Sequence, residues 1–97
     1  MTERATATLH FFVEGRVQGV GYREFTRRAA LRHNLSGWAR NRLNGCVEVR
    51  VSGAAHDLDA LVEMLRSGPP ASAVRALKAI EDDGPPESEG FVIAPTI

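Results

Sequence analysis

Strict alternation of apolar and polar residues marks two strands in this chain. Over residues 8–14, Leu9, Phe11 and Val13 fall on one face and the remaining side chains on the other. Over residues 46–51 three valines alternate in the same way. Because successive side chains of a strand point to opposite faces, a two-residue period is typical of a half-buried strand. Both stretches are therefore predicted strands.

A helical period follows the first of these strands. Tyr22, Phe25 and Ala29 recur at positions i, i+3 and i+7, and charged residues gather on the opposite side. This spacing predicts an amphipathic helix over residues 21–33. We expect Asn34 to end it as a left-handed cap.

The strand at 46–51 has a predicted partner directly before it. Residues 35–42 form that strand, and the Asn44-Gly45 pair between the two is a strong hairpin signal because both residues tolerate positive φ. The Ser-Gly pair at 52–53 is expected to end the hairpin.

The second half of the chain predicts one more helix and two more strands. The helix begins in the acidic stretch 57–59 and ends at the Gly-Pro-Pro sequence 68–70. Its apolar stripe consists of Leu58, Leu61, Val62 and Leu65. A strand is predicted over 73–81, an exposed acidic loop over 82–90 and a short last strand over 91–93.

The resulting order is β-α-β-β-α-β with a short extra C-terminal strand. This order predicts an α+β fold, the ferredoxin-like βαββαβ sandwich, with an antiparallel sheet and two helices on one face. The first and third strands are the expected central ones. We expect residues 1–7 to be a flexible N-terminus and residues 8–97 to form a single domain.

Composition indicates the class of protein to which this domain belongs and where in the cell it is expected. Hydrophobic residues make up 43% and charged residues 25% of the 97 positions, as in ordinary globular proteins. A long apolar run and a leader peptide are both lacking, so we expect a cytoplasmic protein that spans no membrane. Cys46 has no partner for an internal disulfide. The two helices use their apolar stripes on the sheet, so a monomer is expected.

The net charge of zero conceals an asymmetry between the halves. Residues 1–50 hold nine arginines and four glutamates, a balance of +5, whereas residues 51–97 carry −5. A locally positive region suits a small anionic ligand, while a nucleic-acid-binding domain usually carries a net basic charge as well.

The basic half contains a glycine-rich stretch, residues 15–23, between the first strand and the first helix. Three glycines allow positive φ, and the start of the helix offers unpaired N–H groups. Arg23 adds a cation in the first helical turn. The stretch fits a phosphate cradle, but it equally fits a tight connection with a solvated arginine, and spacing alone does not separate the two.

These residues resemble the acylphosphatase family over about residues 8–93. The family's first motif, Gly-Arg-Val-Gln-Gly-Val followed by Gly-aromatic-Arg, matches residues 15–23. Its second motif, Gly-Trp-aliphatic-Arg-Asn with a turn glycine and Val-Glu, matches residues 37–41 and 45–48. Asn44 and Cys46 depart from the family's usual aspartate and its usual threonine or serine.

The resemblance implies hydrolysis of a small-molecule acyl phosphate to a carboxylate and inorganic phosphate, without a metal or any cofactor. Arg23 would hold the phosphate and Asn41 would position the attacking water. The phosphate would also be held by backbone N–H groups of Arg16, Val17, Gln18, Gly19, Val20, Gly21 and Tyr22.

Two other functions share this fold class. RNA-recognition domains stack bases on aromatic residues of the central strands, but the stretch 46–51 has none. A catalytically silent, regulatory acylphosphatase-like domain is the second alternative. Because the chain stands alone and keeps both Arg23 and Asn41, we expect an enzyme that binds no nucleic acid.

Overall fold

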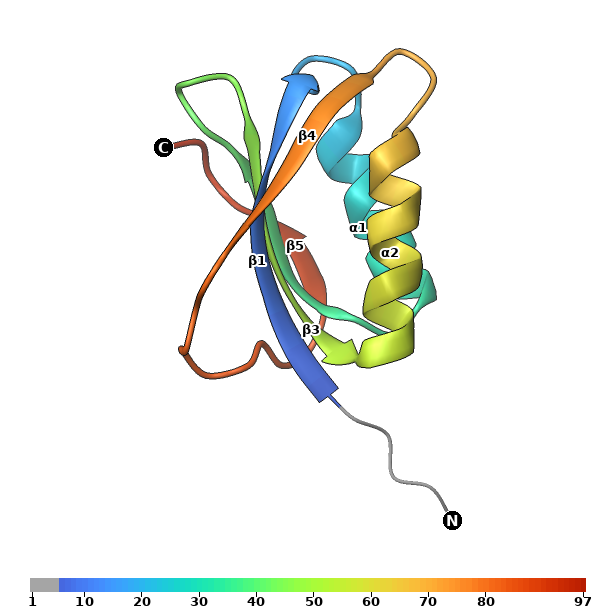
Figure 1. Ribbon diagram of the computed structural model, residues 1–97, viewed down its shortest axis with the longest axis vertical. Helices are drawn as coiled ribbons and strands as arrows, with labels where there is room; N and C mark the ends of the chain where they lie inside the picture. The colour runs from blue at the N-terminus through green and yellow to red at the C-terminus, as the bar shows by residue number, and fades with distance from the viewer. Residues whose placement is uncertain (1–5) are drawn as a thin grey trace.

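The computed structural model describes residues 6–97 and has a sheet covered on one face by two helices (Figure 1). Strand order in the sheet is β4-β1-β3-β2-β5, so the predicted central strands lie inside it. This arrangement confirms the ferredoxin-like α+β sandwich. The elements are β1 Thr6–Arg16, α1 Tyr22–Arg32, β2 Ser36–Asn41, β3 Val47–Ala54, α2 Ala55–Ser67, β4 Ala73–Ile80 and β5 Phe91–Ile93.

The short last strand makes the sheet mixed. The pairings of β1 with β3 and β4, and of β2 with β3, are antiparallel, whereas β5 runs parallel to β2. In this register Phe91 lies beside Gly37, and Ile93 lies beside Ala39. The sequence predicts a strand at β5, but three residues are too few to indicate which strand it pairs with, so its pairing with β2 was not predicted.

The core lies between the sheet and the helices. Val13, Val49 and Leu61 are each fully buried there. The hydroxyl of Tyr22 donates a hydrogen bond of 2.7 Å to the carbonyl of Leu65 and so joins α1 to α2. Burial raises the pKa of Tyr22 well above its usual range, which keeps this donor protonated. The start of α1 is thereby fixed against the end of α2.

Two strands are longer than predicted. Thr6 and Ala7 already belong to β1, so only residues 1–5 of the predicted flexible N-terminus lie outside the described residues. Ser52 does not end β3, because it pairs with Thr8 on one side and Ser36 on the other. Pairing on both edges holds a small polar residue extended despite its preference for turns.

Two turn predictions can be compared with the structure, at the end of α1 and between β2 and β3. Asn34 takes the predicted left-handed conformation, with φ of 57°, directly after α1. The β2–β3 hairpin forms as predicted, but in its turn, residues 42–46, Gly45 alone has a positive φ, of 99°. Asn44 does not use its tolerance of positive φ, and its side chain accepts the N–H of Cys46 at 3.1 Å instead.

An ion-pair network lies on the sheet face opposite the helices. Glu48, only 3% exposed, accepts hydrogen bonds from His10, Arg40 and Arg42. Other members reach the segment between β4 and β5: Arg50 contacts Asp82 and Glu87, and His10 contacts Asp82. The predicted exposed loop 82–90 is therefore fastened to β1 and β3 by its acidic residues.

Acid should loosen this attachment. The Arg50 guanidinium and the Gly84 N–H hold the pKa of Asp82 well below its usual range. Burial acts to raise the pKa of Glu48, but hydrogen bonds from His10 and Arg40 lower it overall. Because both pKa values are depressed in the folded state, the stabilisation is present above about pH 4, the unfolded value, and is lost as the pH falls through the folded values.

Urea unfolding at about pH 7 and about pH 3 measures this effect. The free energy of unfolding should fall on acidification, and Arg50→Met should make the fall smaller because the cation that depresses the pKa of Asp82 is gone. Arg66→Met, at an exposed position on α2, should keep the wild-type dependence. Equal acid sensitivity in Arg50→Met and wild type would contradict this role of the network.

Neither helix within residues 6–97 has the length and apolar character needed to span a membrane.

Candidate functional site

The glycine-rich connection is shorter than its sequence pattern suggested. Gly15 and Arg16 belong to β1, where they pair with Val74 and Ala73 across a register shift. A Cβ on Gly15 would overlap the carbonyl oxygen of Ala73, so this glycine serves the close approach of β4. The loop proper is residues 17–21.

The loop enters α1 through a left-handed residue. Gly21 is the N-cap, with φ of 80°, and no side chain caps the helix start. The first intrahelical bond runs from the N–H of Phe25 to the carbonyl of Gly21 at 3.0 Å. Helix geometry leaves the preceding N–H groups without intrahelical acceptors, and the aligned peptide dipoles make this end positive. The loop therefore ends at backbone donors that the helix itself does not use.

Arg23 lies one residue into this helix and is half-buried. Its neighbour Glu24 does not pair with it, because that carboxylate accepts hydrogen bonds from Arg27 at 2.7 Å and Arg28 at 2.9 Å. Those bonds lower the pKa of Glu24 to about 2. Within residues 6–97, every other arginine that is at least half-buried pairs with a carboxylate. Among the half-buried arginines of this range, Arg23 is thus the one whose charge no carboxylate neutralises.

A cavity of about 160 Å³ lies against this part of the chain. Gly19, Gly21 and Arg23 line it together with Ile93 of β5. A Cβ on Gly19 or Gly21 would meet nothing within 4 Å, so the backbone there faces open space. Of the other residues predicted to bind phosphate through their backbone, Val17 and Tyr22 also line the cavity, whereas Arg16, Gln18 and Val20 do not.

A larger cavity, of about 470 Å³, lies elsewhere and has a different character. Among residues 6–97 it is walled by Thr8, Ser36, Ser52 and Glu87, among others, and by no lysine or arginine. Its charged lining side chain in that range is the Glu87 carboxylate, which disfavours an anion. The smaller cavity is lined by Arg23 and also by Glu24, whose carboxylate pairs with Arg27 and Arg28, so it suits an anion better than the larger one does.

Asn41 ends β2 on the sheet face that the helices cover. It shares that face with Ala39, which is fully buried, while Trp38 lies on the opposite face under the Arg40 guanidinium. Asn41 and Trp38 are therefore on opposite faces of β2. Within residues 6–97, Oδ1 of Asn41 is the one buried side-chain nitrogen or oxygen without a hydrogen-bond partner. Burying such an unpaired acceptor costs free energy, and a water or ligand that donates to it would remove that cost.

The side chain of Gln18 connects the loop to the hairpin that carries Asn41. Its Nε2 donates to the carbonyl oxygens of Arg42 at 2.8 Å and Cys46 at 2.9 Å. The family motif predicts a role only for the backbone of Gln18, and the signal for its side chain is that it is a lone polar residue among glycines and valines. The tether holds the loop and the end of β2 in one arrangement.

Replacing Gln18 with leucine should therefore loosen the site. Two carbonyl groups lose their donor, at about 1–2 kcal/mol of folding free energy, and misplacement of the loop should lower kcat/KM for the substrate proposed below about 10-fold. Steady-state kinetics and urea unfolding measure the two effects.

Ser72→Ala is the matched control, because it also removes a side-chain bond to a carbonyl, that of Pro69. It should cost stability without changing kcat/KM. If Gln18→Leu behaves in the same way, the tether positions nothing that catalysis needs.

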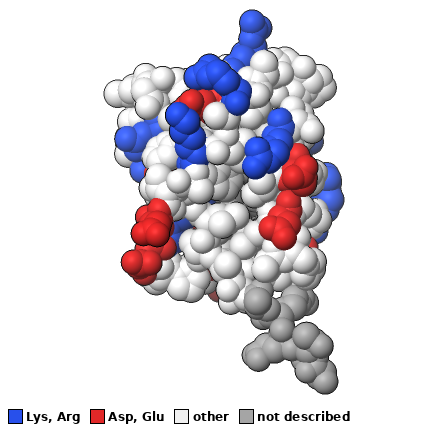
Figure 2. All heavy atoms as spheres, in the orientation of Figure 1, with Lys and Arg blue, Asp and Glu red and all other residues white. Residues whose placement is uncertain are grey.

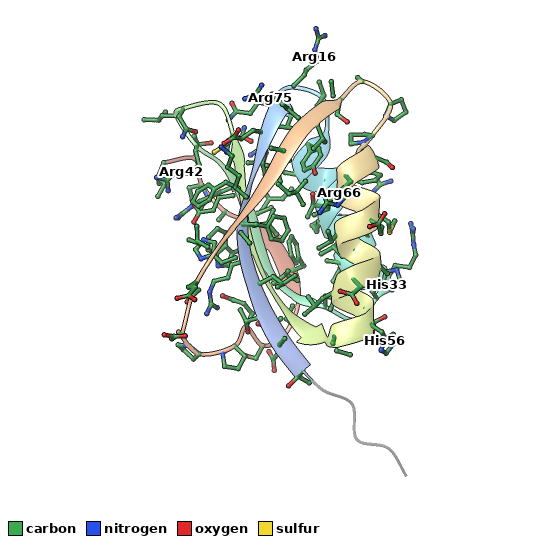
Figure 3. All side chains as sticks on the ribbon, viewed as in Figure 1. Arg16, His33, Arg42, His56, Arg66 and Arg75 are labelled. Carbon is green, nitrogen blue, oxygen red and sulfur yellow. The ribbon has the colours of Figure 1, made fainter. Side chains whose placement is uncertain are left out.

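Charge is distributed unevenly along the molecule. Figure 2 shows basic side chains gathered toward the end where β1 stops and α1 begins, while acidic ones lie mainly in the other half of this view. Arg16 and Arg75 belong to the basic end, and Arg16 points away from the body of the protein (Figure 3). Arg75 comes from the half of the sequence with a net negative charge, so the basic end draws on both halves of the chain. Cations gathered at one end favour the approach of anions there.

Comparison with known proteins agrees with these features. The acylphosphatase family model matches residues 9–93. An acylphosphatase from Azorhizobium caulinodans is 41% identical over 92 residues, which cover 95% of this chain and 99% of that protein.

Two solved structures are also similar. An acylphosphatase from Coxiella burnetii has a TM-score of 0.86 and 32% identity and covers 97% of this chain and 100% of its own. The acylphosphatase from Bacillus subtilis has a TM-score of 0.85 and 33% identity, with coverages of 93% and 99%. The chain belongs to the acylphosphatase family.

Proposed function

We propose that this protein hydrolyses acyl phosphates, releasing a carboxylate and inorganic phosphate, and that it needs no metal ion to do so. One observation carries the proposal: a half-buried arginine without a carboxylate partner in the described chain lies at an uncapped helix start, beside backbone that faces an open cavity. Membership of the acylphosphatase family supports the choice of an acyl phosphate, a mixed anhydride, over phosphate esters as the substrate.

Arg23 and the loop backbone bind the phosphoryl group. A phosphoryl group in transfer spreads its charge over three equatorial oxygens, and stabilising that charge is the main task of the protein. The guanidinium offers a rigid fork of donors, and N–H groups at the helix start add fixed dipoles. The positive charge that a metal ion supplies in other phosphoryl-transfer sites comes here from Arg23 and the helix.

Asn41 positions the water that attacks phosphorus. Its unpaired Oδ1 is an acceptor, and a water that donates to it keeps a lone pair for the reaction. The water oxygen forms a bond to phosphorus while the bond from phosphorus to the acyl oxygen breaks, and the carboxylate leaves with that electron pair. The proton of the water passes to a phosphate oxygen. Because a carboxylate is a good leaving group, no general acid is required.

A nucleic-acid-binding module is the second candidate, and the open face of the sheet argues against it. The aromatic rings there belong to His10, Phe12 and Trp38. The Arg40 guanidinium lies 4.7 Å from the centre of the Trp38 ring, and two carboxylates bind the His10 ring. Stacked bases would have to displace these contacts beside acidic groups.

Phosphate release from benzoyl phosphate in chelator-treated buffer tests the proposal. Wild-type protein should turn over the substrate, and added Mg²⁺ should leave the rate unchanged. An intact substrate would refute the enzyme assignment. Saturable binding of single-stranded RNA by the same preparation would then favour the second candidate.

A further inference from the structure

The cavity beside Arg23 has one wall that phosphate binding does not explain. Six of its seven lining residues come from the loop and the start of α1, and the seventh is Ile93 of β5. Among the apolar lining residues, Val17 and Tyr22 are each only 1% exposed, whereas Ile93 is 40% exposed. Ile93 is therefore the apolar wall with free surface to offer a ligand.

The backbone fixes the position of Ile93. It pairs with Ala39 of β2, and the N–H of the next residue, Ala94, donates to the Ala39 carbonyl at 2.9 Å. Ala39 precedes Asn41 by two residues on the same face of β2. Ile93 thus lies against the strand that carries Asn41 and borders the cavity that Arg23 lines.

The side chains of β5 alternate across the sheet. Phe91 is buried at 4% exposure, and Ile93 shares its face, while Val92 lies on the other face beside Trp38 and is 57% exposed. The exposed apolar surface of Ile93 is surface that a ligand in the cavity can remove from water. Val92 provides a matched position on the same strand that does not border the cavity.

We infer that Ile93 is the contact for the acyl group of the substrate and makes the site prefer acyl phosphates with an apolar acyl group, aromatic or branched, over acetyl phosphate. This inference rests on the proposed function. With the phosphoryl group held by Arg23 and the loop, the acyl group must leave the cavity along one of its walls. When an apolar acyl group packs on Ile93, apolar surface on both is removed from water, and this lowers the free energy of the bound state. The acyl group stays in place while water attacks, so the same contact also stabilises the transition state and raises kcat/KM.

The test compares kcat/KM for benzoyl phosphate and acetyl phosphate in wild type, Ile93→Ala and Val92→Ala. The ratio of the two values should fall about 5- to 10-fold in Ile93→Ala, as expected for the loss of a partly exposed apolar contact. Val92→Ala should keep the wild-type ratio. Comparing ratios between variants cancels the different intrinsic reactivities of the two anhydrides. Ile93→Val, the most conservative truncation, should give a smaller fall and serves if the alanine variant does not fold.

The outcomes separate the two claims. If wild type hydrolyses neither substrate, the proposed function fails and this inference fails with it. If wild type hydrolyses both and the ratio in the Ile93 variants equals that of wild type, only the inference is overturned. An equal fall of the ratio in Val92→Ala would also overturn it, since that residue does not border the cavity.

Discussion

Replacing Arg23 with alanine should lower kcat/KM for an acyl phosphate by about 10³-fold or more, the usual scale for removing an arginine that stabilises phosphoryl transfer. Arg23 is the one half-buried arginine in residues 6–97 without a carboxylate partner. The other half-buried arginines are held in ion pairs, so none of them can supply the missing positive charge in the variant. Inorganic phosphate, the product, should inhibit the variant much more weakly than wild type. Steady-state kinetics with product inhibition measures both.

Arg23→Lys should lie between wild type and the alanine variant. A lysine keeps the charge but not the planar pair of donors that matches two phosphate oxygens. Arg32→Ala is the matched control, because it removes an exposed arginine from the last turn of the same helix. Its kcat/KM should stay within about 2-fold of wild type, the scale of a screened surface charge. Equal losses in Arg32→Ala and Arg23→Ala would mean that only the general positive potential matters.

Arg23→Ala should not destabilise the fold. The side chain forms no ion pair in the described chain, and its positive charge lies at the positive end of α1, an unfavourable place for a cation. Thermal unfolding should therefore give a melting temperature equal to or above that of wild type. Loss of activity without loss of stability is the expected signature of a residue kept for binding.

Replacing Asn41 with alanine should lower kcat about 10²- to 10³-fold, the scale for losing one group that is aligned with the reacting atoms. Phosphate inhibition should change little, because Arg23 and the loop remain. The split between kcat and phosphate affinity distinguishes water positioning from phosphate binding. A kcat equal to that of wild type would remove the role of Asn41 and leave that of Arg23 intact.

Stability offers an independent check on Asn41. Its buried Oδ1 has no partner in the protein, and burying an unpaired polar group costs about 1–3 kcal/mol. Asn41→Ala should therefore be as stable as wild type or more stable. Asn44→Ala is the control, since that side chain accepts the Cys46 N–H in the hairpin turn. It should lose stability and keep its turnover.

Much of the fold was predictable because the dominant signals are local. Alternation in β1 and β3 and the apolar stripes of both helices follow directly from the geometry of strand and helix. The order of those elements left the ferredoxin-like arrangement as the expected packing. The boundaries were less predictable because long-range pairing decides them. Gly15 and Ser52 look like turn residues, yet pairing with neighbouring strands keeps both within strands.

The candidate site divides in the same way. The glycine loop and Arg23 are close together in the sequence, so the motif alone predicts that they form one phosphate-binding site. The tether from Gln18 to Arg42 and Cys46 spans more than 20 residues, and the contact of β5 with β2 more than 50. No local period encodes these approaches, so the positioning of Gln18 and the place of Ile93 emerge only in three dimensions.

Hydrolysis of an acyl phosphate in ¹⁸O-labelled water tests the central claim most directly. If Arg23 and the loop hold the phosphoryl group while Asn41 presents water to it, the bond between phosphorus and the acyl oxygen breaks. Mass spectrometry should then find one ¹⁸O atom in each inorganic phosphate released and none in the carboxylate. Label in the carboxylate would mean that water attacks the carbonyl carbon, and it would contradict a site built around phosphorus.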